Sequence, residues 1–258
     1  SVIATRRDRS HALHDFLDML SHRLVALFAR AGMKYRPARS AAASALAHPS
    51  RTDPVEGALL AFAGYPTPQM ADRVSGDRSP LLFYSGFFSA HPRSAERLES
   101  LLSDWLGQAV RVEQFAGAWL LLRREDRTRL AQGLLPGPWS RLGVDAAIGT
   151  RAWDLQGRVL LRIGPMSRAA FEALMPDRPV LARLVSLVRA FLPPEIGFAV
   201  NPMLEPTQVA PLVLDRAAEP RPRLGWNTWL PLSAPARRRA ADDARFEEVV
   251  IQHAAAAT

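Results

Sequence analysis

The spacing of apolar residues changes between positions 94 and 113, and this change restricts the chain to folds that combine helices with strands. Over 98–106 the apolar residues recur every three or four positions, which is the period of one face of an α-helix. Ser94 is a suitable N-cap for this helix, and Gly107 is a suitable residue at its end. Over 110–113 apolar and charged residues alternate instead, which is the period of a strand. The sequence therefore predicts a helix followed directly by a strand.

The rest of the chain separates into a helical first third and a mixed remainder. An apolar face predicts a long helix over 10–31, and prolines and glycines divide 32–92 into short apolar helices and loops. Further helices are expected to begin at Ser167 and at Pro179. Strands are expected at 146–153, 158–163, 196–204, 211–214, 224–230 and 246–251. The loop over 154–157 is expected to join the first two strands as a hairpin, and Gly164-Pro165 is expected to end the second.

These patterns predict an α+β fold in which a helical N-terminal lobe is followed by helices packed on a mostly antiparallel sheet, with protruding proline-rich loops. We expect three regions: a helical lobe with an extended loop over residues 1–92, an α+β lobe over 93–232 and a charged C-terminal segment over 233–258. The chain begins with Ser1 rather than Met, which is compatible with a fragment of a longer protein.

The composition excludes several classes of protein. Hydrophobic residues make up 48% of the 258 positions and charged residues 22%, which is typical of a globular chain and excludes disorder over most of its length. The absence of cysteine excludes disulfides, thiol catalysis and Cys-ligated metal sites. No stretch approaches the roughly 20 apolar residues that a spanning helix requires, so we expect no direct membrane insertion.

The net charge of +8 leaves a basic nucleic-acid-binding module as an alternative function. Of 33 basic residues only Lys34 is a lysine, and the arginines are spread along the chain with one tight run at 237–239. Dedicated nucleic-acid binders concentrate such charge on one face, and their binding weakens steeply with salt. The spread favours a protein that does not bind nucleic acid.

The strongest metal candidate is a polar stripe on the first predicted helix, made of His11, His14, Asp18 and His22. The stripe lies opposite the apolar face of that helix, whereas a metal site needs a shielded and supported first set of ligands. We therefore interpret it as a solvated or partner-facing row and expect no metal and no cofactor. No nucleophile elbow and no phosphate-binding glycine loop occurs, so we do not expect an enzyme. A hydrolase of unknown type remains possible and requires a shielded pocket with perturbed titratable groups.

Two segments are candidate protein-binding sites. The apolar residues Leu59, Leu60, Phe62 and Tyr65 lie between proline-bearing stretches, so either a partner covers them or the segment folds back on the chain. Trp226 and Trp229 lie in a segment predicted to be extended, which would place the two indoles on opposite faces. One indole would then be core and the other an interface anchor, or both would be buried in the chain's own core.

Short motifs in a fixed order resemble the TssG (ImpH/VasB) family of the type VI secretion system baseplate. The motifs cover more than 200 residues, and their order and spacing carry the resemblance: 15–24, 34–36, 82–86, 93–98, 110–115, 142–145, 149–154, 162–165, 224–230 and 242–243. Two departures stand out. The upstream region typical of the family is missing, and Gly32-Met33 replaces a bulkier, usually aromatic segment before Lys34-Tyr35.

The resemblance implies a structural protein and not an enzyme. Members of the family assemble with two copies of TssF and with TssE into a wedge, and six wedges surround the central spike. Loops of the TssG subunit are implied to insert into trimers of TssK, with the segment around Leu59, Leu60, Phe62 and Tyr65 as our first candidate and 205–223 as the next. The implied location is the cytoplasm, docked at the inner membrane through the secretion apparatus.

Overall fold

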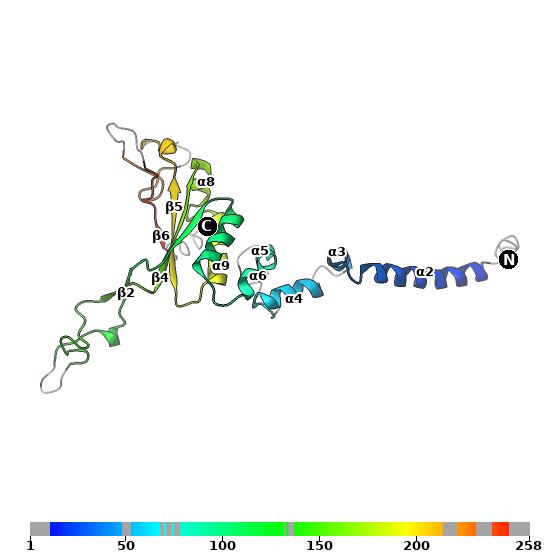
Figure 1. Cartoon of the computed structure of the whole chain (residues 1–258), viewed down its shortest axis with the longest axis horizontal. Helices are drawn as coiled ribbons and strands as arrows, with labels where there is room; N and C mark the ends of the chain where they lie inside the picture. The colour runs from blue at the N-terminus through cyan, green and yellow to red at the C-terminus, as the bar shows by residue number, and fades with distance from the viewer. Residues whose placement is uncertain are drawn as a thin grey trace. The chain divides into compact units, whose positions relative to one another are not determined.

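A computed structural model describes residues 11–47, 53–67, 70, 74, 78–131, 133, 137–213, 221–230 and 239–247 (Figure 1). The chain divides into two compact units, Ser1–Thr67 and Pro68–Thr258. In this division the short helices over 79–89 belong to the second unit, whereas the sequence placed the first boundary after residue 92. The described residues 239–247 also belong to the second unit.

The N-terminal unit consists of three helices in the described part of the chain: α2 (Ala12–Met33), α3 (Pro37–Ala47) and α4 (Pro54–Phe62). A proline opens each of the last two, where its missing N–H leaves no helical bond unmade. Asp53 joins these two helices because its carboxylate caps α4 at the amide of Val55 (3.0 Å) and accepts from the Ser40 hydroxyl of α3 (2.9 Å). These bonds, led by that from Ser40, hold the pKa of Asp53 below its ordinary value.

The predicted helix-to-strand segment is confirmed. Helix α7 (Ala95–Leu106) is capped by the Ser94 hydroxyl, which accepts from the amide of Arg97 (3.3 Å), and Gly107 ends it with φ of 63°. Strand β1 (Val110–Glu113) follows with alternating buried and exposed side chains. Two short helices precede this segment, α5 (Ser79–Phe83) and α6 (Ser85–Ser89).

The main sheet of the second unit has the order β1-β4-β5-β6. Strand β4 (Arg158–Met166) pairs antiparallel with β1 and parallel with β5 (Gly197–Leu204), and β5 pairs antiparallel with the short β6 (Phe246–Glu247). Helices α8 (Arg168–Ala173) and α9 (Pro179–Phe191) form the crossover that a parallel pair requires. The α+β prediction with a mostly antiparallel sheet is confirmed, although the longest pairing is the parallel one.

The predicted hairpin around residues 154–157 is wrong. Strand β3 (Arg151–Asp154) pairs with β2 (Ala118–Leu121) in a separate two-stranded sheet, and β1 occupies the antiparallel side of β4 instead. Gly164-Pro165 also does not end β4, which continues to Met166 through a register shift after Ile163. Gly164 adopts φ of 108°, where a Cβ would lie 2.8 Å from the Met203 carbonyl oxygen.

The core lies between the sheet and helices α7 and α9, which lie beside it in Figure 1. Arg93 closes the end of α9 by donating to the carbonyls of Ala190 (3.0 Å) and Phe191 (2.6 Å), which no helical amide reaches. Its guanidinium also lies against the rings of Phe88 and Phe191. Two short 3₁₀ helices, η2 (Arg124–Asp126) and η3 (Pro206–Gln208), lie in loops. Within the described residues, no helix combines the length and apolar character that crossing a membrane requires.

Two expected strands are not formed. Residues 211–213 carry no regular structure, and 224–227 form a turn followed by irregular chain. Gly225 adopts φ of 76° within that turn, which is a conformation incompatible with a strand. Residue 214 and residues 248–251 of the expected strands lie outside the described residues.

Candidate protein-binding surfaces

Helix α2 presents an uncovered apolar face. None of its 22 residues is buried within the described part of the chain, although its sequence has the periodicity of a helix that packs against another element. The apolar residues that the sequence placed on one face are all exposed: Leu13, Phe16, Leu17, Leu20, Leu24, Leu27 and Phe28. A soluble monomer rarely exposes a contiguous face of this kind, so the helix has the properties of an interaction surface.

The structure divides the predicted segment around α4 into two parts. Leu60 is 5% exposed and its neighbour Ala63 is also buried, whereas Phe62 is 68% exposed. Leu59 and Tyr65 are half-buried, and the Tyr65 amide donates to the Leu60 carbonyl (2.7 Å). Leu60 is therefore an internal residue, Leu59 and Tyr65 keep part of their surface accessible, and Phe62 is the most exposed member of this set.

Sequence reasoning missed a second exposed apolar segment, which we call the arm. It covers residues 114–157, of which the structure describes 114–131, 133 and 137–157. It contains β2, β3 and the long connection between them. Most of its large apolar side chains are more than half exposed: Trp119, Leu120, Leu121, Leu130, Leu142, Val144, Ile148 and Trp153. The signal that could have found it is the run of apolar residues over 118–122 without an amphipathic pattern.

The arm is held together by its own hydrogen bonds. The Leu122 amide donates to the Thr150 carbonyl (2.9 Å) beyond the β2–β3 pairs, and the Thr128 hydroxyl accepts from the Ala147 amide (2.9 Å). Arg141 binds Asp145 at 2.7 Å, and its hydrogen bonds hold the pKa of that carboxyl below the ordinary value. Within the described residues, the exposed apolar side chains are thus carried on a segment that is held by internal hydrogen bonds.

Arg158, the first residue of β4, attaches the arm to the main sheet. Its guanidinium donates to the carbonyls of Ala116 (3.2 Å) and Gly117 (3.0 Å) and forms an ion pair with Glu247 of β6 (3.0 Å). The indoles of Trp119 and Trp153 stack edge to face near this attachment, with ring centroids 5.2 Å apart.

Trp226 and Trp229 both pack against the chain itself and both keep a partly exposed surface. The Trp226 ring lies 5.8 Å from the Phe246 ring, and the Trp229 ring lies 5.7 Å from the Phe171 ring. The Trp229 indole N–H also donates to Asp243 Oδ2 (3.0 Å). The turn over 224–227 replaces the extended chain on which opposite faces had been predicted.

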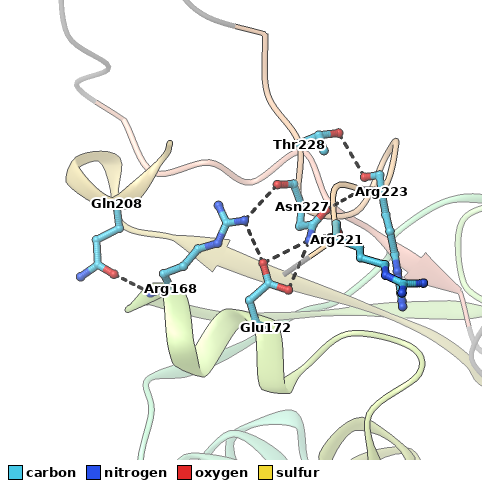
Figure 2. A network of polar contacts seen from close by, with 7 residues as sticks. All are labelled: Arg168, Glu172, Gln208, Arg221, Arg223, Asn227 and Thr228. Carbon is cyan, nitrogen blue, oxygen red and sulfur yellow. Dashed lines mark hydrogen bonds and ion pairs between the residues drawn. The ribbon is translucent and has the colours of Figure 1, made fainter. Parts of the chain in front are cut away.

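A polar network holds this tryptophan segment, and Figure 2 shows the side chains of Arg168 and Asn227 meeting at the Glu172 carboxylate. The Asn227 amide, 4% exposed, donates to both Glu172 carboxylate oxygens (3.2 and 3.3 Å) and to the Arg221 carbonyl (3.1 Å). Its oxygen accepts from the Arg223 amide (2.8 Å). Arg168 forms an ion pair with Glu172 at 2.9 Å. Sequence reasoning singled out the tryptophans and missed the asparagine between them.

The polar stripe of α2 does not form a metal centre in the structure. Across the described residues, no three His, Cys, Asp or Glu side chains come close enough together to hold a metal ion. His14 lies 3.5 Å from the carboxylate of Asp15, its chain neighbour, and His11 precedes the helix without capping it.

Comparison with known proteins gives the family. A family model described as "Type VI secretion, TssG" matches residues 1–231, which is most of the chain. The chain belongs to the TssG family. A search of curated proteins found no match.

Two solved structures resemble this TssG-family chain, each with 23% sequence identity. One belongs to the type VI secretion system TssK-TssF-TssG baseplate subcomplex, with a TM-score of 0.70 over 90% of this chain and 92% of that one. The other belongs to the baseplate complex of the type VI secretion system, with a TM-score of 0.58 over 92% of this chain and 62% of that one. At this identity the two likenesses establish the fold.

Proposed function

We propose that the chain is a structural, non-catalytic subunit of the type VI secretion baseplate wedge. It assembles with two copies of TssF and with TssE, and it docks TssK trimers through apolar loops. Membership of the TssG family supports this function, as does the likeness to a chain of a TssK-TssF-TssG subcomplex. In this role the protein acts in the cytoplasm, docked at the inner membrane through the secretion apparatus.

The observation that carries the proposal is the exposed apolar surface on two separate ordered segments. The face of α2 and the side chains of the arm both have sizes and positions that an independent monomer would bury. Permanent subunits of an assembly cover such surfaces in interfaces that exceed about 2,000 Å² in total. An assembly subunit therefore explains features that an enzyme or a basic binding module does not.

The two surfaces suit different kinds of contact. The apolar positions of α2 recur at helical spacing, so this face fits a partner helix by side-chain packing along the two axes. The arm carries exposed apolar side chains on its two-stranded sheet and on the described parts of the connection between β2 and β3, which suits insertion into a recess of a partner. We therefore assign TssK docking first to the arm, with Phe62, the loop over 205–223 and the exposed edges of Trp226 and Trp229 as secondary contacts.

Co-expression with TssF, TssE and TssK from the same gene cluster tests the proposal. We expect a stable complex for the unchanged chain and loss of a partner when Leu20→Asp and Leu24→Asp place two charges in the α2 face, because a dry contact does not tolerate them. The matched control, His14→Asp with His22→Asp, adds two carboxylates to the opposite face of the same helix and should retain the complex. Purification of the unchanged chain as a stable monomer that binds none of these proteins would contradict the proposal.

A further inference from the structure

A charged pocket of about 230 Å³ opens beside the polar network of Figure 2. Glu172, Asp177, Arg178, Arg221 and Arg223 contribute to its lining, and Met175 is an apolar part of its wall. The buried Asn227 joins the α8 side of the pocket to the segment over 221–228 through four hydrogen bonds. The walls are therefore fixed by the fold.

Both carboxylates of the pocket already have arginine partners. Glu172 pairs with Arg168, and Asp177 Oδ1 lies 2.9 Å from the Arg223 guanidinium. Burial alone would raise the pKa of Asp177, but the contact with the Arg223 guanidinium and the charges of Arg223 and Arg178 hold it below its ordinary value. Glu172 and Asp177 are thus both ionised and are held in ion pairs within the protein.

Two arginine side chains of the pocket have no hydrogen-bonded partner among the described residues, although the charge of Arg178 acts on Asp177. Neither Arg178 nor Arg221 makes a side-chain hydrogen bond or ion pair in the described part of the chain, and both are exposed. With Arg223, the lining holds three arginines and two carboxylates, so it carries an excess charge of +1, and Arg168 outside the lining already neutralises Glu172. A planar guanidinium binds a carboxylate through two parallel hydrogen bonds, which makes an acid the natural occupant.

We propose that this pocket binds an acidic side chain of a protein partner, with its carboxylate held by Arg178 and Arg221. The enclosed volume suits one or two carboxyl groups and the adjoining methylenes, for which Met175 offers an apolar contact. A nucleic-acid backbone is disfavoured because its row of phosphates would pass Glu172 and Asp177. The pocket and its charges follow from the structure of this chain alone. That the partner is another baseplate protein rests on the proposed function.

A fluorescently labelled hexaglutamate peptide, added to the full chain captured on beads, tests the site. We expect it to bind more weakly as salt rises, and hexaglutamine to bind far less. Arg178→Gln with Arg221→Gln should weaken hexaglutamate binding by roughly tenfold or more, since two charge-assisted contacts are lost. Both positions are exposed, so the thermal unfolding midpoint should stay unchanged.

The control variant is Arg111→Gln with Arg151→Gln, which removes the same charge from exposed positions outside the pocket. Equal weakening in the control would overturn the site, as would equal binding of hexaglutamine or no binding of hexaglutamate. Tighter, equally arginine-dependent binding of a six-nucleotide single-stranded DNA would overturn the choice of a protein acid. This assay uses the chain alone, so its failure is distinguishable from failure of the co-expression experiment, which reports assembly.

Discussion

At the scale of single residues, the buried Asn227 side chain ties the segment over 221–228 to helix α8, and nothing in its sequence context indicated this. The neighbouring tryptophans drew attention because large aromatic residues are easily recognised as core or interface residues. A hub residue is defined by the segments that it joins, here Glu172 of α8, 55 residues away in the sequence, and the nearby turn at Arg223. Such a role depends on tertiary structure and leaves no periodic trace in the sequence.

We expect Asn227→Ala to destabilise the chain by about 2–3 kcal/mol, because it removes a buried amide and leaves Glu172 and the Arg221 carbonyl with unmade bonds. Thr228→Ala is the control. It removes the single bond from the Thr228 hydroxyl to the Arg223 carbonyl (3.1 Å) and should cost about 0.5–1.5 kcal/mol. Urea unfolding measures both, and equal losses would show that Asn227 is not the hub.

Tyr84 gives the fold a defined dependence on alkaline pH. Burial, then the hydrogen bond to Asp104 (2.6 Å) and the charge of that residue, raise the pKa of Tyr84 from 10.0 to about 12. The folded chain therefore keeps this proton where the unfolded chain loses it, so the stabilisation is complete below pH 10 and is lost as the pH rises toward 12.

The expected result is a shallower loss of stability between pH 10 and 12 for Tyr84→Phe than for the unchanged chain. Tyr35→Phe, which removes an exposed phenol, should lose stability between pH 10 and 12 as steeply as the unchanged chain does. Unfolding midpoints recorded across this pH range provide the measurement. Identical slopes in all three proteins would show that the Tyr84 proton does not contribute.

At the scale of elements, capping and periodicity identified α7, β1, α9 and β5 because these signals are local. Capping residues affect only the backbone next to them, so the positions of Ser94, Gly107 and Pro179 in the sequence are enough to indicate helix ends. Strand pairing is different because it depends on which strands meet in space. The loop after Asp154 looked like a hairpin, yet the strands on either side of it belong to two sheets.

Strand β1 lies at the edge of the described main sheet, and side chains of helix α7 cover this edge. The Glu99 carboxylate accepts from the Val112 amide (2.7 Å), and the Ser103 hydroxyl accepts from the Val110 amide (3.0 Å). These outward amides would otherwise be available to pair with a strand of another molecule. Side chains of one helix therefore replace the missing neighbouring strand.

Loss of this protection should be measurable in Glu99→Ala. We expect a destabilisation of about 1–2 kcal/mol from the unsatisfied Val112 amide, together with faster aggregation on mild heating. Glu96→Ala changes the same charge in the same helix at an exposed position and should change stability by less than about 0.5 kcal/mol. Thermal unfolding and light scattering measure both variants. Equal stability and equal aggregation of Glu99→Ala and Glu96→Ala would refute the protective role of Glu99.

At the scale of the whole molecule, the sequence indicated a subunit of an assembly but did not locate all of its contact surfaces. The sequence showed the apolar face of α2 as a stripe of apolar residues. It did not show that this face is exposed, because periodicity is the same for a buried and an exposed apolar face. The arm escaped notice because its apolar residues follow neither a helical nor a strand period. Exposure of side chains is a property of the folded chain, so this part of the prediction required the structure.

Mutations in α4 can distinguish residues that stabilise the fold from residues that contact a partner. Leu60 is buried and Phe62, two positions later, is exposed, so the two predicted contact residues have different roles. We expect Leu60→Ala to destabilise the chain by about 2–4 kcal/mol through the cavity that it leaves. Phe62→Asp should leave the unfolding midpoint within about 0.5 kcal/mol of the unchanged chain because its ring is already in solvent.

The same two variants report on assembly when they are co-expressed with TssF and TssK. If the exposed ring of Phe62 is covered by a partner, Phe62→Asp places a charge in a dry contact and weakens co-purification while stability holds. Thr67→Asp, which adds a carboxylate at an exposed position at the end of the same segment, should co-purify normally. Normal co-purification of Phe62→Asp would remove this segment from the contacts and leave the arm as the docking element, since its exposed apolar side chains need a cover of their own.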